Sequence, residues 1–194
     1  MEAIRGLFLC YLVGSLPFAY WITRWRTGLD PFEVGEGNVG ARNVWHVVGP
    51  GWGVLTALLD ALKGVAAVTL ARSWGLDPWL GGFAAVLGHG YPVFHRFRGG
   101  KGLATALGVA LALVPLATVA TLGTYAGLYL LSRHFHFAIT TAMVSFFVVW
   151  VPVSRVPLDQ AKRALLLFLW LGVKRLLDHR HMVQVKARDV HWKG

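Results

Sequence analysis

The sequence predicts an all-α membrane protein with seven transmembrane helices, some short or broken, joined by cytoplasmic glycine-rich loops. Hydrophobic residues make up 56% of the 194 residues and charged residues only 14%, whereas a soluble domain carries roughly 25% charged residues. The apolar residues also occur in long blocks, which are typical of membrane spans. We therefore expect residues 1–194 to form a single integral membrane domain.

The apolar blocks give the positions of the spans. In chain order they are Ala3–Ile22, Gly53–Ala71, Trp79–Phe94, the two halves of Leu103–Leu131, Phe137–Val151 and Ala164–Val173. The Leu103–Leu131 block is too long for one ordinary helix, and Pro115 within it removes a helical hydrogen bond. We therefore expect two helices, broken near Val114 and Pro115.

The first block could be mistaken for a signal peptide. It follows Arg5, but it continues to Ile22 without a clear small-residue cleavage site, so we expect a retained first helix. Ser15 and Pro17 within it are expected to bend this helix or to satisfy a neighbouring group. Cys10 is the only cysteine, so an intramolecular disulfide is impossible.

The distribution of basic residues predicts the orientation. With the N-terminus outside, the inner segments carry 13 basic residues and the outer segments 5, while Lys63 lies inside a span. The inner residues are Arg24, Arg26, Arg42, Arg96, Arg98, Lys101, Arg133, Lys174, Arg175, Arg180, Lys186, Arg188 and Lys193; the outer ones are Arg5, Arg72, Arg155, Lys162 and Arg163. Positively charged loops stay in the cytoplasm, so the C-terminus and both glycine-rich loops are expected there. The net charge of +10 therefore reports topology, and no nucleic-acid partner is expected.

The first glycine-rich loop, VGEGNVGARN, has the spacing G-x-G-x-x-G. It does not follow a strand pattern, so a dinucleotide-binding fold is excluded. Glycines let backbone amides converge on an anion, although a flexible loop explains the pattern equally well. The candidate binding residues here are Gly35, Glu36, Gly37, Asn38, Gly40, Arg42 and Asn43.

The second glycine-rich segment directly precedes a predicted helix. Its candidate phosphate-binding residues are Arg98, Gly99, Gly100, Lys101 and Gly102. Unpaired amides at a helix N-terminus favour phosphate, and Lys101 and Arg98 add positive charge. The alternative is a basic loop that contacts lipid headgroups, but the paired glycines before Lys101 go beyond what such a loop requires.

Three ionisable residues fall in or near the membrane spans. Asp60 and Lys63 lie three residues apart on one helical face, which favours a structural ion pair, although Lys63 is also a candidate phosphate ligand. His89 lies near a helix end before the basic loop. Its two alternative roles are a hydrogen-bonded structural residue and a proton-transfer residue. The eight histidines lack metal-ligand spacing, so neither a metal nor a cofactor is expected.

Four segments resemble the successive motifs of the bacterial acyl-phosphate:glycerol-3-phosphate acyltransferases of the PlsY type. They are GSLPFAYWI, GNVGARNV, DALKG and LGHGYPVFHRFRGGKGLATALG, in the family's order and over nearly the whole chain. The resemblance implies seven membrane helices in a bacterial inner membrane and a site that faces the cytoplasm. It also implies transfer of an acyl group from acyl phosphate to glycerol 3-phosphate, and a functional link to the enzyme that makes acyl phosphate.

The sequence departs from the family pattern on the acceptor side. Glu36 stands where the family loop has a serine important for the glycerol 3-phosphate site, and Arg42 and His46 replace a threonine and an arginine. The family's tail pattern of His-Arg-Glu-Asn is here His179, Arg180, His181 and Met182. His179 is a second candidate for proton transfer and Arg180 another candidate for substrate binding.

These departures leave three hypotheses. The chain is an acyltransferase with glycerol 3-phosphate or a related phosphorylated alcohol as acceptor, a paralogue with another acceptor or donor, or a non-catalytic protein that binds anionic membrane lipid. We expect Glu36 to pair with a cation of its own loop, with Arg42 the preferred partner. Such a pair would leave the loop nearly neutral and weaken the binding of an anionic acceptor. The alternative is that Glu36 points to water.

Overall fold

The computed structural model describes residues 1–188 except the side chains of Arg180, Lys186 and Arg188; Lys193, counted above in the basic tail, lies outside the described residues. The described chain is all-helical. Its elements are α1 (Glu2–Ser15), α2 (Phe18–Thr27), α3 (Ala41–Val47), α4 (Pro50–Ser73), α5 (Pro78–Gly90), η1 (Val93–His95), α6 (Leu103–Leu113), α7 (Pro115–Ser132), α8 (Phe135–Ser145), η2 (Phe146–Trp150), α9 (Val151–Val153) and α10 (Leu158–Arg188).

The helix break expected at Pro115 is confirmed, and near Pro17, where we expected a bend, the chain forms two separate helices. Helix α1 ends at Ser15 and α2 begins after Pro17, while α6 ends at Leu113 and α7 begins at Pro115. Proline has no backbone N–H to donate and clashes with the preceding turn, so the chain reorients at each site. The first break matters most for function because it lies beside the buried charged residues described below.

Three helical stretches among residues 1–188 are long and apolar enough to cross a membrane. They are Glu2–Thr27, Pro50–Ser73 and Phe135–Val153, and Leu103–Leu113 is a shorter apolar helix. Leucine and valine side chains cover the outside of these helices, as Leu58 and Leu62 do on α4, while small residues are buried. This arrangement supports a protein that crosses the membrane several times; the number of seven spans remains a prediction.

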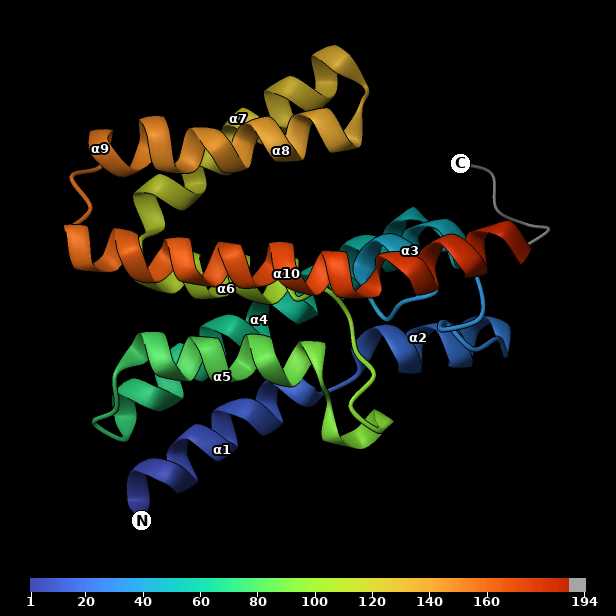
Figure 1. Cartoon of the computed structure of the whole chain (residues 1–194), viewed down its shortest axis with the longest axis horizontal. Coiled ribbons are helices and arrows are strands. Elements are labelled where there is room, and N and C mark those ends of the chain that lie inside the picture. The colour runs from blue at the N-terminus through green and yellow to red at the C-terminus, as the bar shows by residue number, and fades with distance from the viewer. Residues whose placement is uncertain (189–194) are drawn as a thin grey trace.

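The structure differs from the expected elements in two polar parts of the chain, one before α4 and one at the C-terminus. The polar segment Thr23–Trp52, between the first two expected spans, contains the end of α2, the short helix α3 and the start of α4. The expected short span Ala164–Val173 and the tail from Lys174 form one long helix, α10. Helix α10 runs along the molecule between the α7–α8–α9 layer and the layer of α4, α5 and α6 (Figure 1).

Helix α4 is central, because it packs against α1, α3, α5 and α6. Its contact with α6 depends on small residues: a Cβ atom at Gly64 would overlap the carbonyl oxygen of Thr105, and one at Gly108 would overlap that of Ala61. Membrane helices associate through such close backbone approach. This contact holds the N-terminal end of α6, and with it the second glycine-rich loop, against the rest of the molecule.

Replacing Gly108 with valine should therefore separate α6 from α4. Overpacking typically costs about 1–3 kcal/mol, and the obstructing atom here is a backbone carbonyl that cannot move aside. We expect a lower yield of folded protein and a lower thermal unfolding temperature in detergent. Gly123→Val is the matched control, because nothing lies within 4 Å of a Cβ at Gly123; equal unfolding temperatures for the two variants would contradict the predicted close contact.

Candidate active site

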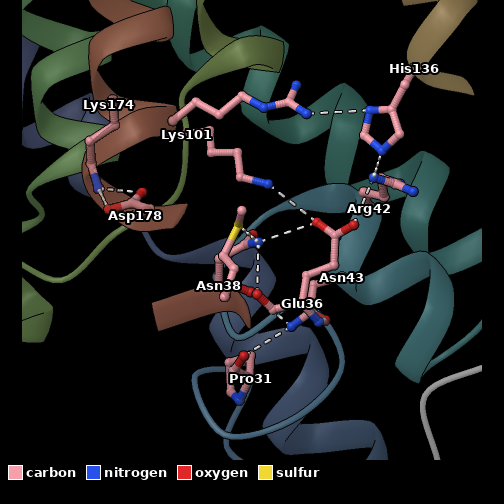
Figure 2. A network of polar contacts seen from close by, with 11 residues as sticks. Pro31, Glu36, Asn38, Arg42, Asn43, Lys101, His136, Lys174 and Asp178 are labelled. Carbon is pink, nitrogen blue, oxygen red and sulfur yellow. Dashed lines mark hydrogen bonds and ion pairs between the residues drawn. The ribbon is translucent and has the colours of Figure 1, made fainter. Parts of the chain in front are cut away.

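The first glycine-rich loop is held in shape by Asn43, a buried residue of α3. Its side-chain amide donates hydrogen bonds to the carbonyl oxygens of Pro31 (2.9 Å) and Asn38 (2.8 Å). Its side-chain oxygen accepts one from the backbone N–H of Glu36 at 2.7 Å. Figure 2 shows these contacts radiating from Asn43 into the loop. The Asn43 side chain therefore fixes the loop, and its part in substrate binding remains a prediction.

The glycines of this loop serve its shape and its contact with α10. Gly35 and Gly37 adopt the left-handed conformation, with φ of 61° and 64°, which other residues rarely adopt. A Cβ atom at Gly37 would lie 2.8 Å from a methyl carbon of Val185. Gly40 precedes α3, and a Cβ there would lie 2.9 Å from the side-chain oxygen of Asn38.

Glu36 lies at the centre of the site, and its side chain is only 2% exposed. One carboxylate oxygen, Oε1, is 2.8 Å from the Arg42 guanidinium, and the other, Oε2, is 3.4 Å from the Lys101 ammonium. Oε2 also accepts a hydrogen bond from the Asn38 side chain at 3.3 Å. The predicted Glu36–Arg42 pair is thus confirmed, and the alternative that Glu36 points to water is wrong because the protein covers this side chain.

The second glycine-rich loop brings Lys101 to this carboxylate. The backbone N–H of Gly100 donates to the carbonyl oxygen of His89 at 3.1 Å, and a Cβ at Gly100 would lie 2.6 Å from the carbonyl oxygen of Val39 in the first loop. The two loops therefore touch through glycine, and α6 begins immediately after Gly102. Lys101 and Glu36 belong to different glycine-rich loops in the sequence, and the fold brings them together (Figure 2).

The surroundings of Lys101 act on its charge in opposite directions. Burial lowers the pKa of the Lys101 ammonium, the Glu36 carboxylate opposes this change, and the positive charges of Arg175 and Arg42 add to it. The ammonium side chain remains 25% exposed. Lys101 thus has a buried anionic partner on one side and access to solvent on the other.

Arg98 and Gly99 lie further along this loop. Arg98, expected to add a second positive charge to the phosphate site, has its guanidinium carbon 4.7 Å from the ring centre of Phe32, a cation–π distance. Gly99 packs beneath the carbonyl oxygens of His89 and Gly90. These two residues tie the second loop to its neighbours, and their part in phosphate binding remains a prediction.

Asp60, Lys63 and His89 form a buried charged cluster below the two loops. The Lys63 ammonium is 2.6 Å from the Asp60 carboxylate, so the ion pair predicted from their spacing is confirmed. His89 Nδ1 lies 3.7 Å from the same carboxylate oxygen. All three residues line a cavity of about 10 Å³ beside the α1–α2 break, roughly enough for one water molecule. Phosphate binding by Lys63 and proton transfer by His89 remain predictions.

The end of α10 covers the first loop. Met182 is buried with its sulfur 3.9 Å from the Asn38 amide nitrogen, and Val185 packs on Gly37. His179 lies on the exposed face of the same helix. Arg180 also belongs to α10, but its side chain lies outside the described residues. The roles that we expected for His179 and Arg180 therefore remain predictions.

Two residues of this site were not identified from the sequence. His136 on α8 lies with Nε2 3.2 Å from the Arg42 guanidinium, and its Nδ1 is 3.4 Å from the guanidinium of Arg175 on α10. Neither belongs to a glycine-rich motif, so no local pattern marked them. Among the described residues, no three His, Cys, Asp or Glu side chains are grouped so that they could hold a metal ion.

Comparisons with known proteins match this arrangement over almost the whole chain. The model of the glycerol-3-phosphate acyltransferase family matches residues 4–187. A glycerol-3-phosphate acyltransferase of Aquifex aeolicus is 38% identical over 185 residues, which cover 93% of this chain and 92% of that protein. One from Thermus thermophilus is 42% identical over 156 residues, 79% of this chain and 78% of that protein.

A solved structure is also similar. It is the glycerol 3-phosphate form of PlsY (YgiH), an integral membrane glycerol 3-phosphate acyltransferase, with a TM-score of 0.78 and 35% sequence identity. The match covers 95% of this chain and 93% of that one. Family model, relatives and fold agree, and we conclude that this chain belongs to the glycerol-3-phosphate acyltransferase family.

Proposed function

We propose that this protein transfers the acyl group of acyl phosphate to the first hydroxyl of glycerol 3-phosphate, at the cytoplasmic face of the bacterial inner membrane. The products are lysophosphatidic acid, which enters phospholipid synthesis, and inorganic phosphate. The observation that carries this proposal is the meeting of Arg42 and Lys101 at one partly exposed point where both glycine-rich loops converge. Family membership supports the acyltransferase activity and the acceptor.

The reaction requires that the enzyme position the two substrates, and it does not require a strongly nucleophilic side chain. Acyl phosphate is an activated mixed anhydride, so the acceptor hydroxyl attacks the carbonyl carbon, the C–O bond to phosphate breaks and an ester forms. Arg42 and Lys101 can orient a phosphate and stabilise the departing one through charge-assisted hydrogen bonds. The hydroxyl proton goes to a base, either a histidine such as His89 or a phosphate oxygen of a substrate.

Genetic rescue tests this function in the cell. A bacterial strain whose own acyl-phosphate-dependent acyltransferase is shut off should grow when it expresses this protein. A family member of established activity, expressed at the same level, is the positive control. Membrane insertion without rescue would contradict the first hypothesis and leave the other two, a paralogue with another acceptor or donor and a non-catalytic protein that binds anionic lipid. Purified protein with acyl phosphate and a panel of alcohols separates these two, because only the paralogue would acylate one of them.

We also propose seven spans with the N-terminus outside and the C-terminus in the cytoplasm, as the 13-to-5 distribution of basic residues predicts. A reporter fused after Gly194 should be active only in its cytoplasmic form. The same reporter fused at the α4–α5 turn, near Gly75, should be active only in its periplasmic form. A periplasmic signal at the C-terminus would contradict the common cytoplasmic location of the two loops.

A further inference from the structure

Arg175 is a third cation near Arg42 and Lys101. His136 lies between the guanidinium groups of Arg42 and Arg175, at 3.2 Å from the first and 3.4 Å from the second. Both guanidiniums are donors, whereas a neutral imidazole has only one acceptor nitrogen. Only one of the two contacts can therefore be a good hydrogen bond. The His136 imidazole alone thus cannot satisfy both guanidinium groups.

The charges of this cluster favour a doubly charged anion. Arg42, Lys101 and Arg175 contribute three positive charges and Glu36 one negative charge, which leaves a net charge of +2. A phosphate monoester carries about −1.5 to −2 charges at neutral pH. The Glu36–Arg42 pair by itself is neutral, as we expected for the first loop, and the two further positive charges come from Lys101, which precedes α6, and from Arg175 on α10.

The geometry also keeps one side of the cluster available to a ligand. Glu36 is held on the buried side by Asn38, and its side chain is 2% exposed. The side chains of Arg42 and Lys101 are 30% and 25% exposed, and Arg175 is exposed. Figure 2 shows Arg42 and Lys101 converging on the Glu36 carboxylate. Glu36 is therefore a fixed, buried counter-charge, whereas the three cationic side chains are accessible to solvent.

We propose that Arg175 binds the phosphate group of a substrate and offsets the fixed negative charge of Glu36, so that these two residues together set the affinity of the site for phosphate. This inference rests on the proposed function. The phosphate belongs either to glycerol 3-phosphate or to acyl phosphate, which present the same chemistry. The KM measured for each substrate distinguishes the two sources.

A charge-restoring pair of variants tests the proposal. Arg175→Gln should raise the KM for one of the two substrates roughly five- to tenfold with little change in kcat, because a charge-assisted contact is lost. Glu36→Gln should lower that KM. The double variant has the wild-type net charge again and should return the KM to within about twofold of wild type. If Arg175 had only a structural role, removing the Glu36 carboxylate as well would not be expected to restore substrate binding.

Two further variants complete the design. Arg175→Lys keeps the charge and should raise the KM less than Arg175→Gln does, and Lys162→Gln removes an exposed basic residue from the other end of α10 and should change neither KM. An unchanged KM in Arg175→Gln, or a double variant as impaired as that single variant, would overturn the proposal. Failure of the proposed function is a separate result, since the wild-type protein itself would then transfer no acyl group to glycerol 3-phosphate.

Discussion

Lys101→Ala should lower the rate of acyl transfer about tenfold to a hundredfold or more, while the protein still folds and inserts. Loss of a hydrogen bond to a charged group costs about 1.5–3 kcal/mol, and each 1.36 kcal/mol is a factor of ten in rate. The ammonium group reaches the Glu36 carboxylate at 3.4 Å yet stays a quarter exposed. It can therefore contact a phosphate without a rearrangement of the loop.

The measurement is kcat/KM for purified protein in lipid nanodiscs, with acyl phosphate and glycerol 3-phosphate as substrates. Lys162→Ala serves as the control, because it also removes an exposed lysine but lies at the far end of α10. Unchanged unfolding temperatures would show that the loss concerns the site rather than the fold. Full activity of Lys101→Ala would mean that the second glycine-rich loop only contacts lipid headgroups.

Asp60→Ala should destabilise the protein strongly, by about 3–5 kcal/mol, because it leaves the buried ammonium of Lys63 without its carboxylate. Asp60 is 1% exposed and Lys63 4%, and the ion pair distance is 2.6 Å. Thermal unfolding in detergent measures the effect. The control is Asp77→Ala, which removes the partner of Arg163 and the side-chain cap of α5 at a partly exposed site and should cost only about 1–2 kcal/mol.

A double variant separates structure from function at this pair. Asp60→Leu together with Lys63→Met replaces both charges with apolar groups of similar volume and should restore most of the stability. If the pair only supports the fold, activity returns with stability. If Lys63 also binds phosphate, stability returns and activity does not. An Asp60→Ala protein as stable as wild type would contradict the burial of this pair.

The sequence predicted the helices and their breaks well because these depend on local properties. Long apolar blocks and the stiff ring of proline act within a few residues, so the break at Pro115 followed directly, and a bend near Pro17 was one of the two expectations there. The Asp60–Lys63 pair followed from helical spacing alone. The Glu36–Arg42 pair followed from charge within one short loop.

The length of helix α10 was underestimated because the part of the helix after Val173 is polar on one side. Lys174 looked like the start of a basic tail, yet it is buried, with its ammonium 2.6 Å from Asp178 and 4.9 Å from the Tyr91 ring centre. The buried or half-buried positions continue along the helix at spacings of three or four residues: Leu167, Leu171, Lys174, Asp178, Met182 and Val185. This period indicates an amphipathic helix, and it was readable in the sequence.

The site itself depends on tertiary contacts that no local pattern contains. Arg42 comes from α3, Lys101 from the loop before α6, His136 from α8 and Arg175 from α10. Packing brings Arg42 and Lys101 to the buried Glu36, and it places His136 between Arg42 and Arg175. Charge within the first loop alone suggested a neutral site, and the opposite conclusion required the positions of residues more than fifty places away along the chain.

The most direct test of the central claim is product formation by the purified wild-type protein from palmitoyl phosphate and glycerol 3-phosphate. We predict equal amounts of lysophosphatidic acid and inorganic phosphate, no product when glycerol replaces glycerol 3-phosphate, and a large loss of both products with Lys101→Ala. Efficient acylation of glycerol, or no acylation of glycerol 3-phosphate by folded wild-type protein, would contradict the proposed transfer of an acyl group from acyl phosphate to a phosphate-bearing acceptor.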